Sequence, residues 1–133
     1  MIAEVALAAV VHLAPVCTDR VVNVLHSAGF RARALRIAYG IVMRESKGQP
    51  RQISRTEDYG LFQFNRATWG RATWWHSTRL LDASHNAAAA WRVSQHGHTF
   101  YPWDINGQGQ HLGRYTSVST YRVFVQYVKA FPC

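Results

Sequence analysis

The chain has 133 residues, of which 48% are hydrophobic and 17% are charged. These values exclude a disordered chain, and we expect a single domain over residues 1–133 whose core needs no structural metal. Fifteen Lys and Arg against seven Asp and Glu give a net charge of +8, which favours nucleic acid, an anionic cell wall or a membrane surface as partner. The basic residues form no run of like charges, so a surface charged only for solubility is an equal alternative.

The apolar, alanine-rich start predicts a helix over residues 2–13, which Pro15 ends. No Lys or Arg precedes this stretch, and Glu4 and His12 interrupt it. We therefore interpret it as the first helix of the domain rather than a secretory signal peptide. It is also too short and too polar to span a bilayer, so we expect no integral membrane segment.

Two further helices are predicted before residue 50. Thr18 or Asp19 caps a short helix that stops before Gly29. Residues 31–46 form the next one, and its buried face is made of Leu35, Ala38, Ile41, Val42 and Glu45. At this buried helix C-terminus a carboxyl group tends to keep its proton, which a general acid requires. A side chain that points to water from a frayed last turn is the alternative.

The middle of the chain has weak periodicity. Residues 49–57 predict a loop with short strand character, and Tyr59 and Gly60 predict a turn. Asn65 or Thr68 opens a short helix that would carry three tryptophans, Trp69, Trp74 and Trp75.

Two helices are predicted in the last third. Asp82 or Ser84 caps an alanine-rich helix over residues 83–95, and residues 99–113 form a glycine-containing loop. Thr116 or Ser117 caps a final helix whose apolar stripe comprises Val118, Tyr121, Phe124, Val125, Val128 and Phe131. The fold class that we expect is mainly α, an α+β arrangement with a small irregular β region.

Glu45 and Asp58 are the most informative pair of residues. They frame the segment that carries the amides Gln63 and Asn65, and they are two of only seven acidic residues. Two carboxylates on either side of a cleft are what glycoside hydrolysis requires, since one protonates the leaving oxygen and the other acts from the opposite side of the sugar.

Other kinds of site find little support. The glycines at 107, 109 and 113 lack the spacing of a dinucleotide loop, and the three histidines at 85, 96 and 98 match no metal-site spacing, so we expect no cofactor and no metal. No nucleic-acid-binding module is recognisable. Cys17 and Cys133 could form one disulfide or remain two thiols; a bridge would contribute roughly 4–5 kcal/mol.

The segments Glu45-Ser46 and Asp58-Tyr59-Gly60-Leu61-Phe62-Gln63-Phe64-Asn65 resemble the catalytic stretch of the lysozyme superfamily, both c-type lysozymes and lytic transglycosylases. The resemblance extends through residues 80–90 to Phe100-x-x-Trp103 and covers about residues 35–103. It implies a lysozyme-like fold, a helical domain with the β region beside a sugar cleft. A Cys17–Cys133 bridge would parallel the one that joins the termini of c-type lysozymes.

The resemblance also implies roles. Glu45 would be the general acid, and Asp58 would stabilise the oxocarbenium-like transition state or attack as nucleophile. The implied substrate contacts are Tyr59, Gln63, Asn65, Trp69, Phe100 and Trp103, with Trp74 as a further stacking residue and Phe100 as the apolar wall beside Glu45. The loop before Asp58 is shorter than in c-type lysozymes, so an enzyme with Glu45 as its one essential carboxylate is an alternative.

The expected function is cleavage of the β-1,4 bond between N-acetylmuramic acid and N-acetylglucosamine in peptidoglycan. The alternatives are a lytic transglycosylase that forms anhydro-muramic ends and a non-catalytic wall-binding protein. We expect a monomer that acts on glycan strands of an anionic cell wall and not on nucleic acid. Without a convincing export signal, a bacterial or phage enzyme released by a partner protein, or a domain of a larger protein, is expected.

Overall fold

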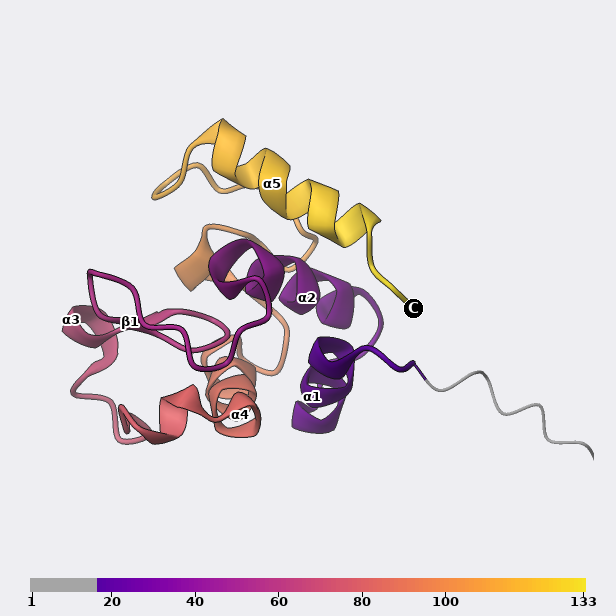
Figure 1. Ribbon diagram of the computed structural model, residues 1–133. Helices are drawn as coiled ribbons and strands as arrows, with labels where there is room; N and C mark the ends of the chain where they lie inside the picture. The colour runs from indigo at the N-terminus through magenta and orange to yellow at the C-terminus, as the bar shows by residue number, and fades with distance from the viewer. Residues whose placement is uncertain (1–16) are drawn as a thin grey trace, which may run out of the picture.

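The computed structural model describes residues 17–133, so the helix predicted over residues 2–13 lies outside the described part (Figure 1). The elements in chain order are α1 (Arg20–Ala28), α2 (Ala32–Ser46), β1 (Asp58–Tyr59), β2 (Phe64–Asn65), α3 (Arg66–Trp69), the 3-10 helix η1 (Arg79–Leu81), α4 (Ala83–Val93), the 3-10 helix η2 (Tyr101–Trp103) and α5 (Val118–Lys129). The fold is mainly helical with one small antiparallel sheet, as predicted.

The helix ends follow the predicted capping residues. Asp19 accepts a hydrogen bond from the Val22 amide at the start of α1, and Gly29 ends this helix with a φ of 128°. Asp82 caps α4 and Ser117 caps α5. These caps satisfy amide groups that have no partner inside the helix, so a local sequence signal is enough to set each boundary.

The long helix α2 is the centre of the arrangement, and α5 runs alongside it (Figure 1). Gly40 makes this close approach feasible, because a Cβ atom there would lie 2.6 Å from Val128 and 2.8 Å from Phe124. Phe124 is the buried residue of the predicted stripe on α5. The prediction for Val118 is wrong: this residue is exposed, because it lies in the first turn of α5, beyond its contact with the core.

A tight hairpin lies beyond the C-terminal end of α2. Asp58 pairs with Asn65 and Tyr59 pairs with Phe64. Gly60 turns the chain with a φ of +73°, and a Cβ atom there would lie 2.2 Å from the Leu80 carbonyl oxygen. The short strands therefore depend on close packing against η1 and α4 rather than on a long ladder.

Asn86 on α4 ties the hairpin to the helical part. It is fully buried, donates to the carbonyl oxygens of Tyr59 and Leu80 at 3.0 and 2.9 Å, and accepts from the Phe62 amide at 3.0 Å. A buried amide with all these partners fixes the backbone around it, because each unmade bond would leave a polar group without water.

Aromatic rings fill the space between α2, the hairpin and η2. The Phe62 ring lies 5.2 Å from that of Trp103 and 6.2 Å from that of Phe30, and the Trp103 indole donates to the Phe62 carbonyl oxygen at 2.9 Å. Ring contacts connect five buried aromatic residues, Phe30, Phe62, Phe64, Phe100 and Trp103. These contacts hold η2 against the hairpin.

Two expectations about local structure are wrong. The helix opened by Asn65 ends at Trp69, so Trp74 and Trp75 lie in the following turns. The helix α4 ends at Val93 rather than residue 95, because Gln95 and the two residues after it adopt positive φ angles. The sequence also gave no indication of η1 and η2.

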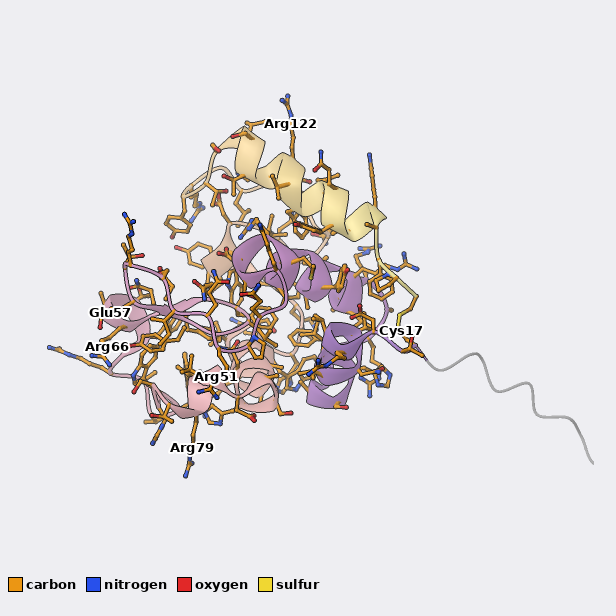
Figure 2. All side chains as sticks on the ribbon, in the orientation of Figure 1. Cys17, Arg51, Glu57, Arg66, Arg79 and Arg122 are labelled. Atoms are coloured by element: carbon orange, nitrogen blue, oxygen red, sulfur yellow. A yellow bond between two sulfur atoms is a disulfide. The ribbon has the colours of Figure 1, made fainter. Side chains whose placement is uncertain are left out.

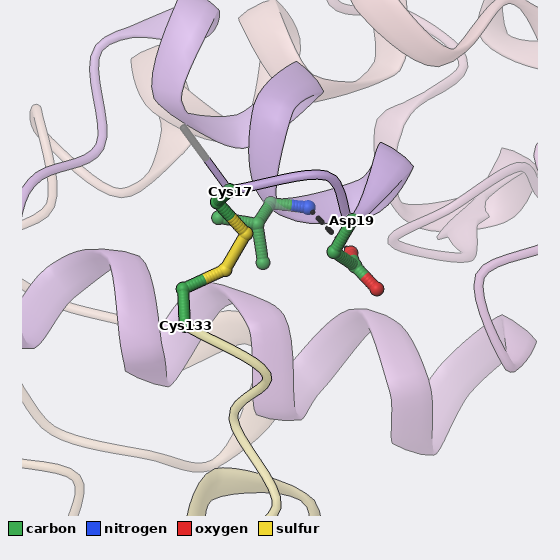
Figure 3. The surroundings of a disulfide bond; sticks show 4 residues. Cys17, Asp19 and Cys133 are labelled. Carbon is green, nitrogen blue, oxygen red and sulfur yellow. Dashed lines mark hydrogen bonds between the residues drawn. A yellow bond between two sulfur atoms is a disulfide. The ribbon is translucent and has the colours of Figure 1, made fainter. Parts of the chain in front are cut away.

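A disulfide joins Cys17 to Cys133, with 5.7 Å between the Cα atoms (Figure 3). It ties Cys133 to Cys17, two residues before Asp19, the cap of α1, and closes a loop of 116 residues. Of the two alternatives that the sequence left open, the bridge is therefore the one that forms. None of the helices within residues 17–133 is long and apolar enough to cross a bilayer.

Candidate active site

One cleft brings together most of the predicted site residues. It has a volume of about 570 Å³ and is lined by Glu45, Asp58, Gln63, Phe64, Asn65, Thr68, Trp69, Tyr101, Pro102, Trp103 and Tyr115. Its walls come from the end of α2, the hairpin, α3, η2 and the loop before α5. Its size lies within the range of small-molecule binding sites.

Glu45 lies in the last turn of α2, and its side chain is 29% exposed, so it is neither fully buried nor free in solvent. Its Oε1 atom accepts a hydrogen bond from Arg44 Nη2 at 2.8 Å. The same Nη2 atom donates to the Trp103 carbonyl oxygen at 3.1 Å. Arg44 thus connects Glu45 to η2.

The Arg44 side chain is only 5% exposed, and its Nε and Nη1 atoms have no hydrogen-bond partner among the described residues. Buried cations are costly unless they are paired. The pairing with Glu45 and Trp103 is therefore the interaction that keeps this guanidinium in place, and in return it restrains the Glu45 carboxyl group.

Asp58 faces the cleft from β1 and is surrounded by donors. The hydroxyls of Ser54 and Thr56 donate to its Oδ2 atom, and the Asn65 amide donates to Oδ1 at 2.9 Å. Burial alone would raise the pKa of Asp58, but these three hydrogen bonds outweigh it and hold the pKa below its usual range. Asp58 is therefore an ionised carboxylate at neutral pH.

The two predicted amides serve mainly the hairpin. Asn65 caps α3 by accepting from the Thr68 amide at 3.1 Å, and its Nδ2 atom donates to Asp58 and to the Thr56 carbonyl oxygen. Gln63 donates to the carbonyl oxygens of Gln52 and Gly60 at 3.1 and 2.9 Å. Both side chains line the cleft, but their amide hydrogens are used to hold the backbone and Asp58 in position.

The aromatic residues divide between cleft and core. Trp69 and Trp103 line the cleft, whereas Trp74 packs against Phe64 with 5.1 Å between the rings and does not line it. Phe100, expected as the wall beside Glu45, is fully buried because it belongs to the ring cluster with Phe30.

Tyr59 also lies outside the lining of the cleft. It alternates with Asp58 along β1, so its side chain points to the opposite face, where it packs edge-on against Trp75 at 5.4 Å. The predictions of substrate contact for Tyr59 and Phe100 are therefore corrected.

Comparison with known protein families decides the identity of the fold. A family model described as "Lysozyme like domain" matches residues 22–105, which is more than half of the chain. The chain belongs to this family. No curated protein and no solved structure gives a significant match. The match confirms the resemblance and the fold class predicted from the sequence.

Glu45, Asp58 and Trp103 lie within the residues that match the family, while Tyr115 lies outside the matched residues. The Cys17–Cys133 disulfide and membership of this family are together consistent with action outside the cytoplasm.

Sequence reasoning missed Tyr101 and Tyr115. A signal for Tyr101 was present, because it lies within the Phe100-x-x-Trp103 stretch whose neighbours were selected. Nothing local marks Tyr115. It reaches the cleft through a bend of the chain that Asp104 organises, which is a long-range effect.

A second cavity, of about 650 Å³, lies beside the disulfide and the start of α1. Among residues 17–133, Asp19 is the one acidic residue that lines it, and this side chain is occupied in capping α1. Because the paired carboxylates line the other cleft, that cleft is the candidate active site. Within residues 17–133, no cluster of three or more His, Cys, Asp or Glu side chains could hold a metal ion.

Proposed function

We propose that this lysozyme-like domain cleaves the β-1,4 bond between N-acetylmuramic acid and N-acetylglucosamine in peptidoglycan. The observation that carries the proposal is the shared cleft: Glu45 and a hydrogen-bonded, ionised Asp58 line it together with the rings of Trp69 and Trp103. Family membership supports the same class of substrate. Lysozyme is itself the type case of such a carboxylate pair.

Glu45 acts as the general acid. Its Oε1 atom is held by Arg44, so Oε2 is the oxygen that carries the proton toward the glycosidic oxygen. As the proton moves, the bond between that oxygen and the anomeric carbon breaks, and positive charge develops on the sugar. A water molecule then adds to the anomeric carbon, and its proton returns to Glu45.

Asp58 stabilises the positive charge on the sugar. The hydrogen bonds from Ser54, Thr56 and Asn65 keep it ionised but also occupy both of its oxygens. A carboxylate so engaged is a weaker nucleophile than a free one, so we favour electrostatic stabilisation over covalent attack.

The engagement of Asp58 also favours a second candidate, a lytic transglycosylase that relies on Glu45 alone. In that reaction a hydroxyl of the muramic acid itself, rather than water, attacks the anomeric carbon. Mass spectrometry of the released fragments separates the two, since hydrolysis leaves a reducing end and transglycosylation leaves an anhydro-muramic end.

The decisive experiment is a turbidity assay on purified cell walls with Glu45→Gln. Loss of the general acid should lower the rate of lysis by about 10²- to 10⁴-fold while the fold is kept. Glu57→Gln is the matched control, because Glu57 is exposed, pairs with Arg66 at 3.5 Å and lies outside the cleft lining. It should lyse walls at the rate of the unmodified protein.

Wall lysis by Glu45→Gln at the unmodified rate would remove Glu45 from the mechanism. Binding to walls without lysis by the unmodified protein would instead identify a wall-binding protein that has lost turnover.

We propose an anionic cell wall as the polyanion that the net charge of +8 favours. Arginines project from opposite sides of the molecule, as Arg79 and Arg122 do (Figure 2). A distributed charge holds the protein near the wall without fixing one orientation. We further propose that the monomer acts in the wall outside the cytoplasm, which the disulfide supports.

A further inference from the structure

Two tyrosines stand exposed at one wall of the cleft. Tyr101 from η2 is 42% exposed, and Tyr115 from the loop before α5 is 60% exposed. Both line the cleft that contains Glu45. Their rings lie 5.6 Å apart at an angle of 80°, and their hydroxyl groups are hydrogen-bonded to each other. The pair therefore acts as one aromatic unit.

The backbone around Tyr115 is held in place by Asp104, which is fully buried. The backbone amides of Arg114, Tyr115 and Thr116 donate to its carboxylate at 2.9, 3.2 and 3.0 Å, and the Thr116 hydroxyl donates at 2.9 Å. Four donors on one buried carboxylate hold the loop rigidly, so the position of Tyr115 is built into the fold rather than left to a mobile tip.

The chemistry of the two tyrosines suits an uncharged sugar ring as ligand. Rings that are this exposed offer apolar area that gains free energy when a ligand covers it, and the C–H face of a pyranose matches such a surface. The hydrogen bond with Tyr101 raises the pKa of the Tyr115 hydroxyl, so this phenol is neutral in the physiological range. The Arg114 guanidinium lies 5.7 Å from the Tyr101 ring centre and covers part of that ring.

We propose that Tyr101 and Tyr115 form a stacking platform for a further N-acetylated sugar of the glycan strand, next to the two sugars that flank the scissile bond. Asp58, Gln63 and Asn65 belong to the hairpin, whereas the two tyrosines come from η2 and the loop after it, so they offer a separate wall of the same cleft. Tyr101 lies within the residues that match the family, and Tyr115 lies outside them. The inference rests on the proposed function.

The test uses Glu45→Gln as parent, so that bound glycan is not cleaved. Oligomers of two to six β-1,4-linked N-acetylglucosamine units keep the acetamido group and the linkage of the proposed substrate. Their dissociation constants are measured from the fluorescence of Trp69 and Trp103 in the cleft. Adding Tyr115→Ala or Tyr101→Ala should weaken binding of the hexamer by about five- to tenfold and leave the dimer unchanged within about twofold.

Tyr115→Phe is the matched control, since it keeps the ring and removes the hydroxyl; it should bind the hexamer as the parent does. Circular dichroism checks each fold, and Tyr115→Ala is the safer variant because Tyr115 is the more exposed of the two.

Hexamer binding that neither alanine variant weakens would overturn the platform while leaving the proposed function standing. An equal loss for dimer and hexamer would also overturn it, because it would show that the tyrosines shape the cleft near the scissile bond. If the folded parent binds no oligomer and the unmodified protein leaves walls intact, the proposed function fails and the platform fails with it.

Discussion

Asp104 shows how one buried side chain can organise a wall of the cleft. Burial by itself would raise the pKa of Asp104, but the amides of Arg114, Thr116 and Tyr115 and the Thr116 hydroxyl hold the pKa well below its usual range. Removing the charge leaves these donors facing a neutral amide. We therefore expect Asp104→Asn to lower the free energy of unfolding by about 2–4 kcal/mol at pH 7.

The loss of unfolding free energy in Asp104→Asn should depend on pH in one direction. Because the folded pKa lies below the unfolded one, the stabilisation is fully present above about pH 4 to 5 and is lost as the pH falls toward the folded pKa. Asp104 Oδ2 also lies 3.1 Å from His111 Nε2, so the comparison is made at pH 5 and below. Urea unfolding should there show a gap between the unmodified protein and Asp104→Asn that shrinks below pH 4.

Tyr115→Phe serves as control, because it keeps the backbone amide that reaches Asp104, and it should follow the unmodified profile. A gap that stays constant down to pH 2 would contradict the assignment of the stabilisation to the Asp104 carboxylate.

Arg44 restrains the carboxyl group of Glu45, the proposed general acid. It ties the candidate acid Glu45 to the backbone of Trp103, so a movement of η2 reaches the carboxyl group through one side chain. Arg44 and Glu45 are neighbours in the sequence, yet only the structure shows that the guanidinium also binds the Trp103 carbonyl oxygen in η2.

Among the elements, the hairpin depends most on exact packing. At Gly60 the backbone has a φ of +73°, and an added Cβ atom would lie 2.2 Å from the Leu80 oxygen and 2.3 Å from Asn86 Nδ2. Gly60→Ala must therefore push the hairpin away from η1 and α4. We expect it to lower the free energy of unfolding by about 3 kcal/mol or more, measured by thermal or urea unfolding.

Gly113→Ala separates the two causes of that loss. Gly113 has a similar φ of +75°, but an added Cβ atom would meet its nearest neighbour, His111, only at 3.9 Å. It should therefore lose only about 1 kcal/mol from the backbone conformation. Equal losses for the two variants would show that close packing contributes nothing at Gly60.

The predictable parts of the fold are those with local causes. Asp19, Asp82 and Ser117 cap the helices as expected, because a cap acts on amides within three residues. The carboxylate pair was predictable for a different reason, since the stretch from Asp58 to Asn65 carries a family resemblance.

The misplaced residues depend on long-range packing. Phe100 and Tyr59 looked like cleft residues from their neighbours along the chain, but ring contacts with Phe30 and Trp75 draw them into the interior. Tyr115 was missed because its position follows from Asp104, eleven residues earlier. No periodicity or capping pattern encodes such contacts.

For the whole molecule, the disulfide limits how far Cys17 and Cys133 can separate. Beside it, the C-terminal segment is also held by Phe131, whose ring packs edge-on against Tyr39 at 5.4 Å and carries the Arg36 guanidinium at 4.9 Å. These contacts stabilise the folded state, whereas the bridge acts chiefly by restricting the unfolded chain. The two effects should therefore be separable by experiment.

We expect the double variant Cys17→Ser, Cys133→Ser to fold and to lose up to about 5 kcal/mol of unfolding free energy, because the bridge closes a loop of 116 residues. Urea unfolding measures the loss, and reduction of the unmodified protein should reproduce it, while the reductant should leave the double variant unchanged. Phe131→Ala should lower stability equally with and without the bridge, since its contacts belong to the folded state. A double variant as stable as the bridged protein would mean that the ends are already held together in the unfolded chain.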